Sequence, residues 1–215
     1  MSFGLLFTNT SDVVTLDSEY SRLVILYYAR FGEGGVKGAV FKAPITSQEP
    51  PLIFAKPDGN GVFQWVRLLG GPGNWTGFLN ESTTTVGTYF LAVYESTPTA
   101  SFGMRLWGGD NKLLFDSGTP CAQITRFITS WNLISYVNPS PGLWIYTWNT
   151  DAPLSAGDYM LINNIAFDIP CNSTYGKLSC SWNYQSNKVS AQVQNIGDLN
   201  PNSFFVPLMF AKPII

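Results

Sequence analysis

The sequence predicts an all-β fold, built as two antiparallel β-sandwich-like domains with a partial internal repeat. Short runs rich in Val, Ile, Phe, Tyr, Trp and Thr are separated by Gly, Pro, Asn and Asp about every eight to twelve residues, which is typical of strands joined by turns. Only 12% of the residues are charged and 15% are aromatic, a balance that favours strands and interfaces over solvated helices. Finally, two segments of the chain occur twice.

The first recurring segment predicts a β-hairpin at the start of each half of the chain. Ser2-Phe3-Gly4-Leu5-Leu6-Phe7 leads through a polar turn to Val14-Thr15-Leu16-Asp17-Ser18. Ser101-Phe102-Gly103-Met104-Arg105-Leu106 leads in the same way to Leu113-Leu114-Phe115-Asp116-Ser117. The connections contain the Asn, Asp and Gly residues that hairpin turns prefer, so each segment is expected to form strand, turn and strand.

The second recurring segment predicts a pair of edge strands. Pro51-Leu52-Ile53-Phe54-Ala55-Lys56-Pro57 and Pro207-Leu208-Met209-Phe210-Ala211-Lys212-Pro213 are identical at six of seven positions. Proline cannot donate a hydrogen bond to a neighbouring strand, and edge strands use it to prevent further pairing. A Ser/Thr/Pro-rich stretch near 96–100 reads as a linker, so the expected domains are 1–97 and 98–215, the second with extra strands inserted.

The remaining strands are expected where apolar and aromatic residues cluster between turn residues. They lie at 23–31, 36–42, 52–55, 62–69, 88–94, 104–107, 113–115, 143–148, 159–163, 178–184 and 204–210. No segment has the periodicity of a convincing helix.

Charge and composition exclude several classes of function. The net charge is −2 without a basic cluster, which argues against nucleic acid as a partner. The longest apolar run, 23–29, is far below the roughly 18 residues of a spanning helix, and the first residues lack the basic region of a secretion signal. The chain has no histidine, which removes the commonest general base and imidazole metal ligands. We therefore expect no enzyme, no cofactor, no metal and no membrane insertion.

The best candidate binding residues are Trp144, Tyr146 and Trp148, which alternate along one expected strand and so share one face. Such a face can stack on sugar rings, form a subunit interface or belong to the core. The apolar run 203–215, with Phe204, Phe205 and Phe210, is a candidate assembly contact that must dock on its own domain or on a neighbouring subunit. So few charged residues also suggest a homo-oligomer.

The three cysteines, an odd number, exclude a complete disulfide framework. Cys171 and Cys180 flank an expected hairpin turn at 172–177, which could place the two thiols opposite one another. They are either a pair of free thiols, as a reducing compartment favours, or a disulfide.

The two hairpin segments, 2–18 and 101–117, resemble small tail-module proteins of long-tailed bacteriophages. In those proteins a Phe-Gly, strand, turn, strand, Asp-Ser hairpin starts a β domain, and the members are virion components near the tail tip or fibres. The resemblance covers roughly a quarter of the chain and carries no catalytic residue. It implies a structural or receptor-contact role in a virion that is assembled in the host cytoplasm.

We therefore expect a virion structural protein of the tail tip or tail-fibre region. Its expected partners are copies of itself, with a trimer favoured by analogy with phage tails, other tail proteins, and a host-surface glycan or protein receptor. One alternative is a carbohydrate-binding module or lectin-like adhesin that uses Trp144, Tyr146 and Trp148. Another is an acid-based glycan hydrolase, which no spacing of the fourteen carboxylates supports.

Overall fold

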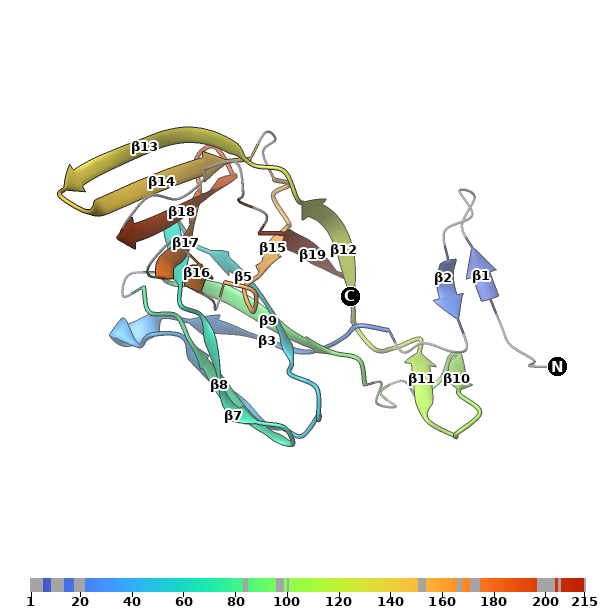
Figure 1. Ribbon diagram of the computed structural model, residues 1–215. Helices are drawn as coiled ribbons and strands as arrows, with labels where there is room; N and C mark the ends of the chain where they lie inside the picture. The colour runs from blue at the N-terminus through green and yellow to red at the C-terminus, as the bar shows by residue number, and fades with distance from the viewer. Residues whose placement is uncertain are drawn as a thin grey trace.

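The structure, a computed structural model, consists of antiparallel strands (Figure 1). It describes residues 6–8, 14–17, 22–82, 85–95, 99, 101–150, 154–165, 168–170, 175–196, 204 and 206–214. Strand pairs among these residues are antiparallel, so the predicted all-β antiparallel fold is confirmed. The helix found among them is η1 (Glu33–Gly35), a three-residue 3-10 turn. No helix in this part of the chain is long and apolar enough to cross a membrane.

The centre of the protein is a closed barrel of six strands. In order around the barrel they are β12 (Cys121–Ile128), β19 (Leu208–Ile214), β15 (Tyr159–Leu161), β5 (Leu52–Pro57), β9 (Gly87–Val93) and β3 (Val24–Phe31). The barrel closes where Val24 of β3 pairs with Cys121 of β12. Because the barrel is closed, none of these strands has an unpaired edge. The three strands from either half of the chain alone could not close the ring and would leave edges unpaired.

This barrel corrects the division of the chain expected at residue 97. Its strands come in equal number from 1–97 and from 98–215, and the two sets pair with each other twice, β3 with β12 and β5 with β15. A further strand of the first half, β6 (Gly61–Gln64), pairs with β17 (Tyr175–Asn183) of the second half. The ranges 1–97 and 98–215 are therefore not separate sheets.

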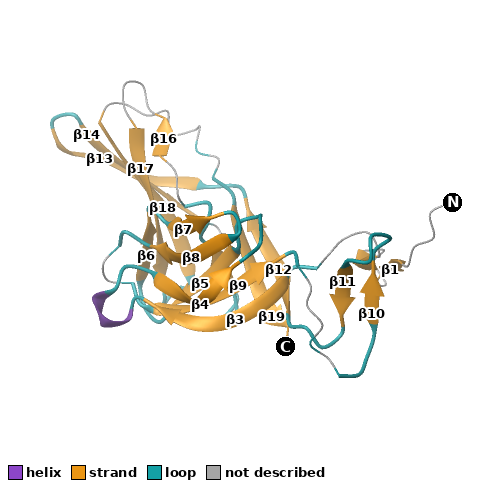
Figure 2. Cartoon of the chain, turned by 90° about the horizontal axis from the view of Figure 1, so that it is seen from below, coloured by secondary structure: helices purple, strands orange, loops and turns teal. Residues whose placement is uncertain are grey.

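A second assembly of strands, here called the large sheet, packs beside the barrel. Its strands, in order, are β13 (Asn132–Ser140), β14 (Leu143–Asn149), β18 (Lys188–Ile196), β17 and β16 (Asp168–Pro170), with β6 also paired to β17. The hairpin of β13 and β14 projects from the body of the protein (Figure 1) and does so again in the perpendicular view (Figure 2).

One continuous core fills the space between the barrel and the large sheet. Its largest buried side chains come from both, among them Phe31, Tyr89 and Phe210 of the barrel and Phe63, Trp148 and Trp182 of the large sheet. A smaller sheet formed by β4 (Ala39–Ile45), β8 (Asn74–Leu79) and β7 (Arg67–Gly71) adds Phe41 and Phe78 to this core. Each such side chain stabilises the fold by about 1.5–3 kcal/mol through burial alone.

Both predicted hairpins are present, and they share one register. In the first, β1 (Leu6–Thr8) pairs with β2 (Val14–Asp17) so that Leu6 lies opposite Asp17. In the second, β10 (Arg105–Trp107) pairs with β11 (Leu113–Asp116) so that Arg105 lies opposite Asp116, 99 positions later in both strands. The register also shifts at the same step in both hairpins. The hairpins stand together at one end, apart from the barrel (Figures 1 and 2).

The prediction of edge strands at 51–57 and 207–213 is wrong. β5 pairs with β9 and β15, and β19 pairs with β12 and β15, so both have a neighbour on each side. The prolines are tolerated because they lie outside the strands or at their ends. Pro57 is the last residue of β5, and Pro213 is the last but one of β19.

Candidate binding surface

Trp144, Tyr146 and Trp148 share one face of β14, as strand alternation predicts, but that face points into the protein. Tyr146 and Trp148 are only 2% and 1% exposed and belong to the core. Their rings stack with 5.9 Å between centroids, and Trp148 stacks on Phe204 at 4.3 Å. Of the three alternatives left open by the sequence, core packing is therefore the one that describes Tyr146 and Trp148, and neither ring is available as a ligand platform.

Trp144 lies at the rim of this stack. It is partly buried, and its ring centroid lies 6.2 Å from that of Tyr136 on β13. Tyr136, which is 61% exposed, also stacks on Tyr146. At this surface, solvent therefore reaches the aromatic stack at Trp144 and at Tyr136, a residue that the sequence reasoning did not single out.

The candidate assembly contacts Phe204 and Phe210 are also buried within the chain. The ring of Phe210 packs edge-on against Trp182 with 6.1 Å between centroids. Phe204 lies between Trp148 and Trp131, at 4.3 and 5.4 Å. The apolar run thus docks on its own chain, and these two rings are not available to a second copy. Phe205 lies outside the described residues.

The opposite face of the large sheet carries neutral polar side chains. Along β17 and β18, buried apolar residues alternate with partly exposed Ser and Gln residues. The pairing registers align one such residue from each strand into a row, here called the polar row: Ser135 of β13, Thr147 of β14, Gln192 of β18, Ser179 of β17 and Gln64 of β6. Within the described part of the chain, none of these side chains is held by a hydrogen bond to another residue.

The rows on either side of the polar row are also almost free of charge. One consists of Asn149, Ser190, Ser181 and Val62, and the other of Val137, Ile145, Gln194, Lys177 and Asp168. The Lys177 ammonium lies 4.5 Å from the centroid of the Trp65 ring, a cation–π contact. Lys177 and Asp168 are the charged residues of these rows in the described part of the chain, and their formal charges are opposite.

Trp65 has an unusual backbone. It connects β6 to β7 with a φ of 47°, in the left-handed region that bulky side chains seldom adopt, and it remains 37% exposed. Such a conformation costs on the order of 1–3 kcal/mol and persists only where the surrounding structure enforces it. The result is an indole held at the border of the polar row.

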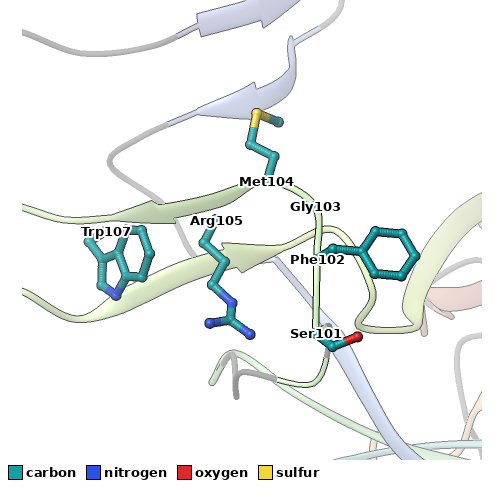
Figure 3. A pocket seen from close by; sticks show the side chains of 6 residues that line it. All are labelled: Ser101, Phe102, Gly103, Met104, Arg105 and Trp107. Carbon is teal, nitrogen blue, oxygen red and sulfur yellow. The ribbon is translucent and has the colours of Figure 1, made fainter.

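The second hairpin contains an open hollow of about 470 Å³ (Figure 3). Its lining residues are Ser101, Phe102, Gly103, Met104, Arg105 and Trp107. Phe102, which is 89% exposed, points away from Trp107 (Figure 3). The hollow is shallow and lies on a single hairpin, so it does not enclose a ligand.

The residues shared by the two hairpins explain how the hairpin holds its shape. Gly103 has a φ of +129°, and a methyl group there would run into the Ser117 hydroxyl oxygen. That oxygen instead accepts the backbone N–H of Met104 at 3.0 Å. The buried Asp116 carboxylate accepts hydrogen bonds from Arg105 Nε at 2.7 Å and from the Gly118 N–H at 2.8 Å. The Phe-Gly and Asp-Ser signatures are therefore structural in this hairpin.

Cys180 lies in β17 and is a free, buried thiol. Residues 175–177, which the sequence placed in a turn, belong to β17 and pair with β16. The partners of Cys180 across the sheet are Phe63 and Ala191. Burial raises the pKa of the Cys180 thiol to about 12, so it stays protonated at neutral pH. Cys171 itself lies outside the described residues.

The buried carboxylates of the described residues have structural partners. Asp158 accepts hydrogen bonds from the Thr125 hydroxyl at 3.0 Å and the Ser155 N–H at 2.8 Å. Asp110, expected in a turn, accepts the Lys112 N–H at 3.0 Å. The described residues contain no cluster of carboxylates and thiols that is suited to a metal ion.

Comparison of the chain with protein-family models, with curated proteins and with solved structures gives no match.

Proposed function

We propose that this protein is a structural component of a bacteriophage virion, located in the tail tip or tail-fibre region. In this role it assembles with copies of itself and with other tail proteins, and it contributes to contact with the host. The protein acts by holding neighbours and not by catalysis.

The observation that supports this proposal is the duplicated hairpin. The resemblance to phage tail modules rests on residues 2–18 and 101–117, and the described strands of these segments form hairpins with one register and one bulge position. In the second copy, Gly103, Asp116 and Ser117 each have a defined role in the hairpin. The duplicated segment on which the resemblance rests is therefore a structural unit of this protein.

The hairpin of β13 and β14 is the surface best suited to assembly. Every residue of β13 is exposed, and in the large sheet β13 pairs on one side, with β14. Residues 127–150 contain no charged side chain, although charged residues are a common means of keeping strand edges apart. An uncharged, projecting hairpin of this kind favours pairing with another chain.

Labelling of phage particles tests the proposed location. Antibodies raised against the purified protein should mark the tail tip or fibres of particles of the phage that encodes it, as seen by negative-stain electron microscopy. Labelling of the capsid, or particles that lack the protein in mass spectrometry, would overturn the proposal.

Light scattering of the purified protein tests self-association. A discrete oligomer is expected, with a trimer favoured by analogy with phage tails. Val137→Lys on the exposed β13 should lower its mass, because a charge on an unpaired edge opposes pairing. Val40→Lys makes the same change at an exposed position on β4 and should leave the mass unchanged. A monomer at all concentrations would contradict homotypic assembly.

A further inference from the structure

We propose that the outer face of the large sheet binds a neutral oligosaccharide along the polar row, Ser135, Thr147, Gln192, Ser179 and Gln64. This inference deepens the proposed function, on which it rests for the source of the ligand, a neutral polysaccharide of the host cell surface. The binding itself is a property of the isolated protein and can be measured without the virion.

The chemistry of the face matches a neutral sugar. Serine and threonine hydroxyls and glutamine amides both donate and accept hydrogen bonds, as sugar hydroxyls do. Within the described structure these five side chains have no protein partner, so their hydrogen-bonding groups face water and are available to a ligand. The hydroxyl groups of a sugar can take over the hydrogen bonds that these side chains make with water.

The charge of this face favours a neutral ligand over an acidic saccharide or a nucleic acid. Among the described residues of the polar row and its neighbours, the charged ones are Lys177, whose ammonium lies over the Trp65 ring, and Asp168, which pairs with Lys177. These two formal charges cancel. Phosphate recognition requires several cations, and sialic or uronic acids are held by Arg and Lys. These rows offer a single Lys, opposite an Asp, so an uncharged saccharide is the ligand whose charge they match.

The dimensions of the row fit a chain of sugars and not a single one. The polar row crosses five adjacent strands, β13, β14, β18, β17 and β6. Neighbouring strands are spaced by about 4.8 Å, which makes the row roughly 19 Å long. The ligand would lie across the strands and meet one hydrogen-bonding side chain of the polar row on each strand that it crosses.

Trp65 provides the apolar contact that such a site needs. Aromatic rings bind the C–H faces of sugars, and the partly exposed indole of Trp65 is fixed near the Gln64 end of the row. Residues held in sparsely populated backbone conformations cluster at binding and active sites. Trp65, with its positive φ, is a residue of this kind.

A protein partner fits this face less well. The buried centre of a protein interface is enriched in aromatic residues, Met and Arg, whereas the polar row consists of Ser, Thr and Gln. A second copy of the chain is better accommodated by the uncharged edge of β13. The two surfaces share β13, so changes at Gln192 of β18, away from that strand, separate them.

The test is binding of the purified full-length protein to an array of bacterial polysaccharides. The neutral probes are dextran, mannan, galactan and neutral O-antigen polysaccharides, and the acidic probes are polysialic acid and uronic-acid capsules. We expect binding to at least one neutral polymer and none to the acidic set. Failure to bind any neutral polymer, or a preference for acidic ones, would overturn the inference and leave the proposed tail location standing.

Variants then locate the site. Gln192→Ala removes the central side chain of the row and should weaken binding about tenfold, the effect of one hydrogen bond that the ligand loses. Trp65→Phe keeps a ring and should weaken binding less than Trp65→Ala. The matched control Gln123→Ala changes an exposed glutamine on β12, outside the large sheet, and should bind like the original protein.

Circular dichroism of each variant separates lost binding from lost folding. Equal loss of binding in Gln192→Ala and Gln123→Ala would place the site elsewhere and contradict the inference. If Gln192→Arg lowers the mass in light scattering, the face is an interface between copies of the chain, which also overturns it.

Discussion

Replacing Trp148 by Ala should strongly destabilise the protein. The indole is buried, it stacks on Tyr146 and Phe204 with 5.9 and 4.3 Å between centroids, and it belongs to the shared core. Truncation of such a side chain costs about 3–5 kcal/mol, because apolar burial is lost and a cavity remains. Since the whole free energy of unfolding of a protein is about 5–15 kcal/mol, this change removes a large share of it.

Urea unfolding followed by far-ultraviolet circular dichroism measures this loss without relying on tryptophan fluorescence. The original protein, Trp148→Ala and Tyr136→Ala are compared, the last as a control because Tyr136 is largely exposed. We expect the control to lose about 1 kcal/mol or less. A loss below about 1 kcal/mol in Trp148→Ala would show that the indole is not packed as described and would revive its role as a ligand platform.

A double-mutant cycle isolates the contact between Trp148 and Phe204. Trp148→Leu, Phe204→Leu and the double variant keep an apolar side chain at both positions. The stacked pair should show a coupling free energy of about 0.5–1.5 kcal/mol, because ring stacking contributes beyond the buried area. Additive effects would mean that Phe204 does not lie on Trp148, and that the apolar run is not anchored there.

Three further changes have defined outcomes. Gly103→Ala introduces a clash with the Ser117 hydroxyl, so trypsin should cut after Arg105 faster while the barrel melts at an unchanged temperature; a lower melting temperature would contradict a purely local role. Asn80→Ala leaves a backbone N–H and a carbonyl of β6 without their buried partner, so the free energy of unfolding in urea should fall by about 1–3 kcal/mol. A fall of less than roughly 0.5 kcal/mol would mean that water replaces the amide. Burial raises the pKa of the Cys180 thiol from 9.0 to about 12, so the unfolded chain releases this proton first. The contribution of this thiol to the free energy of unfolding is then fully present below about pH 9 and is lost at up to about 1.4 kcal/mol per pH unit as the pH rises toward 12. Cys180→Ala should reduce this slope, and an identical slope in both proteins would contradict the burial of the thiol.

Local features of the fold could be predicted from the sequence because they depend on neighbouring residues. The hairpin at 101–117 is set by turn residues and by the Gly103 and Ser117 contact, all within a short segment. The pairing of β3 with β12 could not be predicted, since nothing in the alternation of either strand specifies a partner almost a hundred residues away. The expected division at residue 97 was inaccurate for this reason.

The candidate site shows the same limit. Alternation correctly placed Trp144, Tyr146 and Trp148 on one face, but a single strand does not indicate which of its faces is covered by other elements. The polar row was also present in the sequence, as Ser179 between Leu178 and Cys180 and as Gln192 between Ala191 and Val193. Only the register of five strands shows that these residues lie side by side.

The position of β19 between β12 and β15 has a consequence for how the protein is made. The ring of strands stays open until residues 208–214 leave the ribosome, so β12 and β15 each have one unpaired edge from the time they are made until then. Contacts between distant parts of a chain form slowly, and unpaired edges attract other chains in the meantime. Production in bacteria should therefore yield more folded protein when synthesis is slowed at low temperature, and a fragment that ends at residue 207 should collect in inclusion bodies.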